Sequence, residues 1–264
     1  MIYTIFMDFI QAIILGIVEG ISEFLPISST GHLILTSHFL GINQTEFVKT
    51  FEIAIQSGAI LSVIVLYGKK MLNNIELCKR VLVAFIPTAI VGFILYKFIK
   101  QFLLGNELVV LAAFLIGGIA LILVEVLFKK RKMQSFPEEQ QITYKNALII
   151  GLFQSIAVIP GVSRSAASIV GAMLLGTSRE AAVEFSFLLA VPTILAATAL
   201  DLKETSFSFN SNEWMLLAVG FLVSFITALL AMKWFIKFVQ TNTFVPFGIY
   251  RIVLAVLYFL LIIK

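Results

Sequence analysis

The chain has 264 residues, of which 60% are hydrophobic and only 13% are charged. Soluble domains carry roughly 25% charged residues, and no soluble fold of this length has enough interior to bury so much apolar surface. The mean hydropathy of +1.03 therefore predicts a polytopic membrane protein, and the net charge of +4 is too small to indicate a nucleic-acid partner.

The first predicted element is an apolar helix over residues 4–22. After Pro26 the next apolar stretch runs only to Leu40. Because 15 helical residues extend about 22 Å, this stretch is too short to cross a hydrocarbon core of about 30 Å. Residues 4–40 are therefore predicted to form a re-entrant helical hairpin that enters and leaves on one side. Three full spans are expected next, over 50–67, 72–96 and 107–128.

The second half begins after a basic linker at 129–141 and repeats this order. A helix at 142–157 is followed, after Pro160, by a short apolar stretch that ends at Leu175. We expect a second re-entrant hairpin over 142–175 and three further spans over 180–200, 214–236 and 246–263. The predicted fold class is an all-α polytopic integral membrane protein with about ten helices, six of them full spans and the others in two re-entrant hairpins.

The two halves also resemble each other in sequence. "GIVEGISEFLPISST" (16–30) aligns without a gap on "GLFQSIAVIPGVSRS" (151–165) at an offset of 135. Since each hairpin precedes an odd number of spans, the second half starts on the opposite side of the membrane. Residues 1–128 and 142–264 are thus predicted to form an inverted-topology repeat in one membrane domain, whose site lies near the midplane where the repeats meet.

The charges of the loops predict the orientation. With the linker on the cytoplasmic side, twelve Lys and Arg residues of the loops lie inside and five lie outside. The positive-inside rule then places both termini and the mouth of the first hairpin on the outer side, although Lys97 and Lys100 weaken the bias.

The first break carries two carboxylates at helical spacing. Glu19 and Glu23 lie at positions i and i+4, so they share one face of the helix. At membrane depth they would repel each other unless a cation lies between them, and oxygen ligands favour Mg²⁺ or Ca²⁺. The alternative is a structural ion pair with an arginine, or a buried protonated acid.

Hydroxyl groups follow the carboxylates. Ser28, Ser29 and Thr30 stand where the N-cap of the next helix belongs. These hydroxyls either cap the helix only or, together with its free N–H groups, bind an anion. His32 lies within one turn of them and is a candidate general base or acid. His38 lies near the end of the short helix and is assigned no role.

The second break, "PGVSRSAAS" (160–168), repeats the layout with an arginine in place of a hydroxyl. Arg164 can bind a phosphate through two parallel hydrogen bonds. Ser163, Ser165 and the local amides add donors. Two half-helix N-termini are expected to face each other near the midplane, one binding metal and the other cationic. Such a pocket suits a diphosphate, because a diphosphate is bound by metal and arginine together.

These segments and "FEIAIQSGAI" (51–60) closely resemble the bacterial undecaprenyl-diphosphate phosphatases of the bacitracin-resistance type, and the likeness covers nearly the whole chain. The resemblance implies hydrolysis of undecaprenyl diphosphate to undecaprenyl phosphate, which recycles the carrier lipid of peptidoglycan synthesis. It also implies dependence on a divalent cation, and a multi-pass protein of the bacterial cell membrane whose active site faces the outer side.

The resemblance also assigns roles to residues. Glu19 and Glu23 match the acidic motif, Ser29 and His32 match residues proposed as nucleophile and acid/base, and Arg164 matches the phosphate-binding arginine. The nucleophile stays open: Ser29 activated by His32, His32 itself, or water activated by His32.

The chain departs from the family pattern where the second motif usually reads SRSGxT. Ala166 replaces the glycine and Ser168 replaces the threonine. Ser168 keeps a hydroxyl, but its role as a contact is left open.

A transporter or flippase for a polyprenyl phosphate lipid is the alternative function, because inverted repeats with broken helices are typical of alternating access. A structural scaffold would not need the intramembrane charges. Expected partners are undecaprenyl diphosphate, other polyprenyl diphosphates and membrane lipid. A homodimer is left open, because the small residues Gly117 and Gly118 permit close helix packing within one chain as well. Glu52 and Glu184 occupy matching repeat positions and are expected to serve helix packing.

Overall fold

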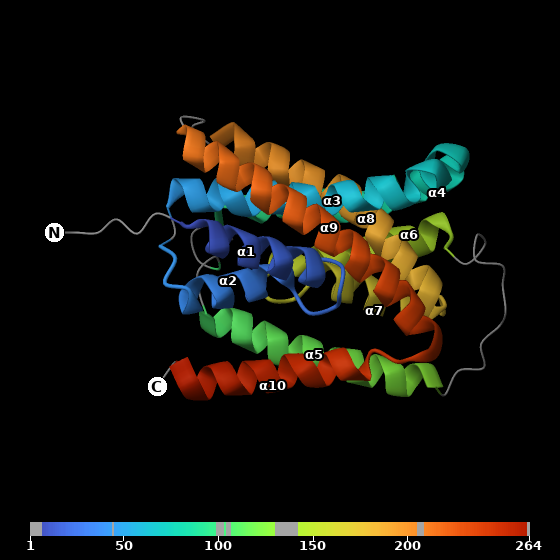
Figure 1. Ribbon diagram of the computed structural model, residues 1–264. Helices are drawn as coiled ribbons and strands as arrows, with labels where there is room; N and C mark the ends of the chain where they lie inside the picture. The colour runs from blue at the N-terminus through green and yellow to red at the C-terminus, as the bar shows by residue number, and fades with distance from the viewer. Residues whose placement is uncertain are drawn as a thin grey trace.

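The computed structural model describes residues 7–43, 45–98, 103, 107–129, 142–204 and 209–262, and these residues contain ten α-helices. The helices lie alongside one another in a bundle (Figure 1). In chain order they are α1 (Phe9–Ser22), α2 (Ser29–Phe39), α3 (Glu46–Asn73), α4 (Ile75–Phe98), α5 (Glu107–Lys129), α6 (Tyr144–Ser155), α7 (Arg164–Leu174), α8 (Arg179–Glu204), α9 (Ser211–Thr241) and α10 (Val245–Ile262), with the short 3₁₀ helix η3 (Ile156–Val158) after α6.

Helices α3, α4, α5, α8 and α9 are long and apolar enough to cross a membrane. Each corresponds to one of the predicted full spans. The sixth predicted span corresponds to α10, which has 18 residues and is grouped by length with the shorter apolar helices. The prediction of an all-α polytopic membrane protein is therefore confirmed.

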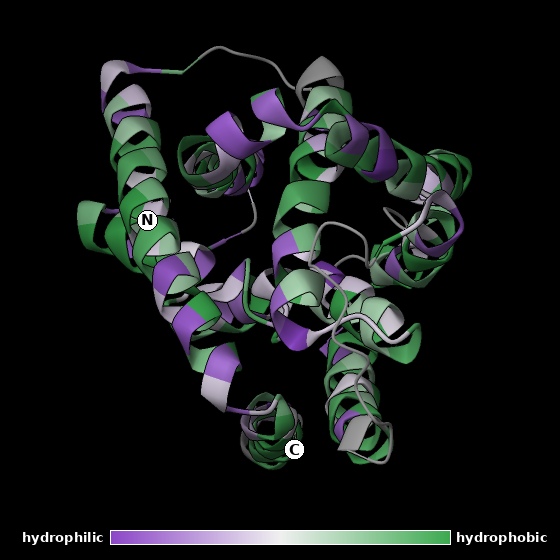
Figure 2. Ribbon diagram, turned by 90° about the vertical axis from the view of Figure 1, so that its right-hand side faces the viewer, coloured by the Kyte–Doolittle hydropathy of each residue, from purple (hydrophilic) through white to green (hydrophobic). Residues whose placement is uncertain are grey.

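The apolar outer surface agrees with this conclusion. Large hydrophobic side chains stay exposed along several helices, among them Ile10 at 68%, Phe93 at 73% and Ile116 at 67%. Viewed along the helices, most of the ribbon is coloured as hydrophobic (Figure 2). A soluble monomer rarely exposes large contiguous apolar patches, so lipid is the solvent that this surface fits.

Two pairs of short helices interrupt the pattern of spans. Helices α2 and α7 have 11 residues each, which corresponds to about 16 Å and is too short to cross the hydrocarbon core. Each follows a slightly longer helix, α1 or α6, and packs against it. The helices start close to the predicted positions, since Pro26 and Pro160 both lie in the breaks between them.

Helices at equivalent positions of the two halves of the chain make equivalent packing contacts. Helix α1 packs on α9, and its counterpart α6 packs on α4, the counterpart of α9. The corresponding helices α3 and α8 pack on each other, as do α5 and α10. This pattern supports the inverted repeat, which stays a prediction, as does the division at 1–128 and 142–264. Residues 130–141 of the predicted cytoplasmic linker lie outside the described residues.

The small residues of α5 serve packing inside the chain. A Cβ atom on Gly118 would lie 2.7 Å from the carbonyl oxygen of Gly248 in α10, and the reverse substitution would meet the carbonyl oxygen of Gly118 at 2.7 Å. Helices α5 and α10 lie side by side in Figure 1. The Gly117–Gly118 pair is therefore accounted for without a second copy of the chain.

Candidate active site

Two serines with unusual backbone conformations precede the short helices α2 and α7. Ser28 has φ = 72° and Ser163 has φ = 76°, and among the described residues they are the non-glycine residues with positive φ. Each side chain caps its helix by accepting a backbone N–H, from Gly31 at 3.4 Å and from Ala166 at 3.1 Å. Such strained conformations persist where the surrounding structure imposes them, often at functional sites. Here they occur at equivalent positions of both breaks.

The two breaks meet at a cavity of about 200 Å³. The N-termini of α2 and α7 both reach it, so their free N–H groups and positive helix-dipole ends favour an anion there. Two spans, α3 and α8, complete its wall. Its polar lining consists of Glu23, Ser28, Ser29, Thr30, Gln56, Ser163, Arg164 and Thr193.

Glu23 connects the two hairpins at the centre of this cavity. Ser29 Oγ donates a hydrogen bond to Glu23 Oε2. Arg164 contacts the other oxygen, Oε1, from Nε at 3.4 Å and from Nη2 at 3.3 Å. The side chains of Glu23 and Arg164 are 7% and 11% exposed. The Glu23 carboxylate thus contacts a hydroxyl from the first hairpin and a guanidinium from the second. It is also a base that can accept the proton of the serine hydroxyl.

Glu19 lies one helical turn before Glu23 and is completely buried. No hydrogen bond to either of its carboxylate oxygens is found among the described residues. It interacts electrostatically with the like charges of Glu23 and, more weakly, Glu52 on α3, and with the opposite charge of Arg164. An uncompensated buried carboxylate is costly, so this side chain fits a bound cation. Among the described residues no group of three or more His, Cys, Asp or Glu side chains could hold a metal. A cation held by Glu19 and Glu23 would therefore take further oxygens from water and substrate, as Mg²⁺ commonly does.

The hydrogen-bond partners of His32 are groups other than the Ser29 hydroxyl. Its Nδ1 lies 2.8 Å from the carbonyl oxygen of Ser28 and its Nε2 lies 2.7 Å from the hydroxyl oxygen of Tyr250. The imidazole also stacks on the Tyr250 ring, with centroids 5.6 Å apart. Both ring nitrogens are engaged, and Ser29 bonds to Glu23 instead. The role of His32 as acid or base stays a prediction.

The remaining predicted residues divide into two groups. Thr30 and Ser163 line the cavity. Ser165 is fully buried, and its hydroxyl donates to the carbonyl oxygen of Phe24 at 2.8 Å, which ties the second break to the first. Ser168 bonds to Ser186 Oγ at 2.7 Å. The predicted contact of Ser165 with phosphate thus stays a prediction, while its observed contact joins the hairpins.

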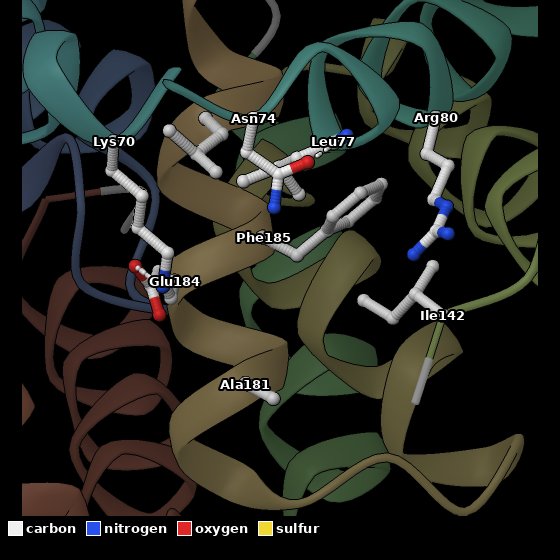
Figure 3. A pocket seen from close by; sticks show the side chains of 9 residues that line it. Lys70, Asn74, Leu77, Arg80, Ile142, Ala181, Glu184 and Phe185 are labelled. Carbon is white, nitrogen blue, oxygen red and sulfur yellow. Dashed lines mark hydrogen bonds and ion pairs between the residues drawn. The ribbon is translucent and has the colours of Figure 1, made fainter. Parts of the chain in front are cut away.

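A second, smaller cavity of about 40 Å³ lies between α3, α4 and α8. Figure 3 shows Lys70 and Glu184 in contact with each other at one side of it, with 2.8 Å between Nζ and Oε1. Lys70 is about 21 Å along α3 from Gln56 of the first cavity. Its charged lining residues are Lys70, Glu184 and Arg80, and neither of the two breaks contributes to its lining. Glu184 joins α8 to α3, the helix-packing role predicted for it.

The structure adds residues that sequence reasoning missed. Gln56 and Thr193 line the cavity from mid-helix positions of α3 and α8. Their signal was weak, because a lone polar side chain in an apolar helix is common at helix contacts. No sequence pattern linked Tyr250 to His32, since 218 positions separate them.

Comparison with known proteins gives one consistent result. The family model described as bacitracin resistance protein BacA matches residues 12–257. A curated relative named undecaprenyl-diphosphatase from Aquifex aeolicus is 54% identical over 94% of this chain and 96% of its own length. Relatives of the same name from Sulfurihydrogenibium sp. and Persephonella marina are 53% and 52% identical, over 96% and 97% of this chain and 99% and 100% of their own lengths.

Proposed function

The chain belongs to the family of the bacitracin resistance protein BacA, and on this premise we propose that it is an undecaprenyl-diphosphatase. It hydrolyses undecaprenyl diphosphate to undecaprenyl phosphate and inorganic phosphate, and so recycles the lipid carrier and confers bacitracin resistance. The observation that carries the proposal is the contact of Ser29 and Arg164 with one carboxylate, Glu23, in the cavity between the hairpins. A nucleophile, a base and a phosphate-binding cation are thereby brought together.

Ser29 is the proposed nucleophile and Glu23 its base. Glu23 takes the hydroxyl proton while Ser29 Oγ attacks the terminal phosphorus, and the bond from that phosphorus to the bridging oxygen breaks. Glu23 passes this proton to the bridging oxygen of the departing undecaprenyl phosphate, and Ser29 carries the phosphoryl group. Water then attacks this phosphorus, Glu23 takes a proton from the water and returns it to the departing serine oxygen, and inorganic phosphate is released.

Arg164 and the two helix N-termini stabilise the charge on the transferring phosphoryl group. The guanidinium points at Glu23 Oε1 and is fixed from behind, since Nη1 donates to the carbonyl oxygen of Ser186 at 2.8 Å. Donors already in place need no reorganisation during the reaction. Ser28 and Thr30 on one side and Ser163 on the other are the proposed further contacts of the phosphates, because all three line the cavity.

Glu19, with Glu23, is the proposed holder of a divalent cation, Mg²⁺ or Ca²⁺. When bound, such an ion supplies positive charge that neutralises the phosphate oxygens. The support for this assignment is the completely buried Glu19 carboxylate, which has no hydrogen-bond partner among the described residues and interacts with the like charge of Glu23.

The test is phosphate release by the purified protein in detergent, with undecaprenyl diphosphate or farnesyl diphosphate and Mg²⁺ or Ca²⁺. Metal-dependent release is expected, whereas binding without release would favour the transporter alternative, because detergent micelles hold no gradient. Ser29→Ala should abolish release. The matched control Ser57→Ala should not, because this hydroxyl donates to the carbonyl oxygen of Ile53 within α3. Release by Ser29→Ala at the parental rate would exclude the serine route in favour of water or His32 as nucleophile.

The cavity is proposed to face the outer side of the bacterial cell membrane, because the loop charges place the basic loops inside. Cys78, the single cysteine, lies near the start of α4 and serves as a probe. An impermeant maleimide should label it in inverted vesicles and not in intact cells. In a Cys78→Ser background, Ser211→Cys at the start of α9 should show the opposite pattern. The reverse result for both cysteines would invert the orientation.

A further inference from the structure

Arg251 on α10 is a charged residue in an apolar helix, and it is completely buried. All five N–H donors of its guanidinium group are used. Nε donates to one backbone carbonyl at 3.3 Å, Nη1 to two at 3.0 and 3.2 Å, and Nη2 to two at 2.8 Å each. The five accepting carbonyls belong to Phe114, Pro26, Val162, Ala113 and Gly161.

These acceptors come from three segments that are far apart in the sequence. Pro26 lies in the break of the first hairpin, and Gly161 and Val162 lie in the break of the second. The other two carbonyls belong to the middle of α5. One planar group therefore ties both breaks to each other and to a full span.

The position of the acceptors relative to the strained serines is informative. Pro26 precedes Ser28 by two residues, and Val162 directly precedes Ser163. Ser28 and Ser163 cap the two helices whose N-termini reach the cavity. Fixing these carbonyls therefore fixes the distance and orientation between the two halves of the phosphate site.

Helix packing alone does not explain the arginine. Among the described residues its guanidinium bonds to carbonyls and to no carboxylate, and burying a charge without a counter-ion is costly. Replacing buried charges by apolar side chains of similar volume is often neutral or stabilising. The fold also leaves room for this group, since a Cβ atom on Gly117 would lie 2.2 Å from Arg251 Nη2. The guanidinium fixes the positions of five carbonyl groups relative to one another, which an apolar side chain cannot do.

We propose that Arg251 is a positioning residue that fixes the distance and orientation of the two re-entrant breaks relative to each other. It thereby sets the rate of phosphoryl transfer without touching the substrate. It is absent from the lining of the cavity, so it acts through Pro26 and Val162 on the two serine caps. The claim that Arg251 sets the rate rests on the proposed phosphatase function. The claim that it fixes the two breaks rests on the structure alone.

The kinetic test is Arg251→Lys, which keeps the positive charge but offers three donors instead of five. Since a displacement of about 1 Å costs roughly 10²-fold in rate, kcat should fall about 10²-fold with KM changed by less than about threefold. The matched control is Arg179→Lys. Arg179 makes a bidentate pair with buried Glu125, at 2.9 and 2.6 Å, and lies about 21 Å along α8 from Thr193. Both variants should melt at lower temperature, but the control should keep the parental kcat where it is folded.

A second variant reaches the same contact by another route. Gly117→Ala keeps Arg251 and pushes its guanidinium off the carbonyls of Ala113 and Gly161. It should reproduce the loss in kcat, and it carries the test if Arg251→Lys yields no folded protein. Parental kcat in either folded variant would overturn the proposal, as would an equal loss of kcat in Arg179→Lys.

Hydrogen exchange separates failure of this inference from failure of the proposed function. In Arg251→Lys, peptides covering 24–32 and 160–168 should exchange faster than in the parental protein, whereas Arg179→Lys should leave both unchanged. This result supports the positioning role even if the parental protein releases no phosphate, an outcome that would refute the phosphatase assignment alone. Unchanged exchange in both segments of Arg251→Lys would refute the positioning role itself.

Discussion

Replacing Glu23 by glutamine is the most direct perturbation of the proposed site. The carboxylate accepts the hydrogen bond of Ser29 on one oxygen and contacts Arg164 on the other, at 3.3 and 3.4 Å. Glutamine has the same shape, but it carries no charge and cannot accept the serine proton. The change therefore removes the base and also leaves the Arg164 guanidinium without its carboxylate partner.

The two consequences act on different kinetic constants. Loss of a general base lowers kcat by about 10²- to 10⁴-fold, which corresponds to about 3 to 5 kcal/mol in the activation free energy. A guanidinium released from its carboxylate is freer to bind an anionic diphosphate, so KM should stay equal or fall. We expect Glu23→Gln, assayed at saturating metal because Glu23 is also a proposed metal ligand, to lose kcat without any rise in KM.

The assay is phosphate release in detergent over a range of substrate concentrations. Glu184→Gln is the matched control, because it also removes a carboxylate from an ion pair, Lys70–Glu184 at 2.8 Å, in the second cavity. The control should keep kcat within about twofold, since Glu184 is absent from the lining of the first cavity and lies about 14 Å along α8 from Thr193. A Glu23→Gln variant that keeps kcat within the same range would refute Glu23 as the base. A KM raised at saturating metal would refute its pairing with Arg164 in the free enzyme.

Three further outcomes follow from the same contacts. Glu19→Gln should raise the metal concentration that gives half-maximal rate at least about tenfold, because it removes a proposed ligand charge; an unchanged metal requirement would exclude Glu19 as a ligand. Ser165→Ala should lower kcat several-fold, because the buried hydroxyl no longer holds the carbonyl of Phe24. The unpaired carbonyl should also lower the free energy of unfolding by about 1 to 3 kcal/mol. Parental kcat and a parental melting temperature would show that the contact is dispensable. Gly151→Ala would place a Cβ atom 2.1 Å from the carbonyl oxygen of Ala84, and should lower the melting temperature by several degrees as α6 separates from α4.

Much of the fold was predictable because it follows from local patterns. A membrane helix must satisfy its own backbone hydrogen bonds, so the lengths of the apolar stretches were enough to separate the spans from the short helices α2 and α7. Proline and capping serines end and start helices through contacts within a few residues. Hence Pro26, Pro160 and the candidate cap Ser28 located the breaks correctly without knowledge of any distant contact.

The partners of the polar side chains depended on contacts between distant segments. From the sequence, Ser29 was paired with His32 because they lie close together in the chain, yet the structure pairs Ser29 with Glu23 and gives His32 to Tyr250. Helical spacing places Glu19 and Glu23 on one face, but only the packing of α7 against the first hairpin brings Arg164 to Glu23.

Arg251 shows the same division. The sequence by itself determined that a charge lies in an apolar helix, which marks a residue with a specific task. Only the tertiary structure decided the task, because its acceptors are backbone carbonyls up to 225 positions away. Every residue has a carbonyl, so no side-chain pattern can show which ones converge on a guanidinium. The sequence thus determined the class of protein and the two breaks, while the packing of the breaks on α5 and α10 decided the geometry of the site.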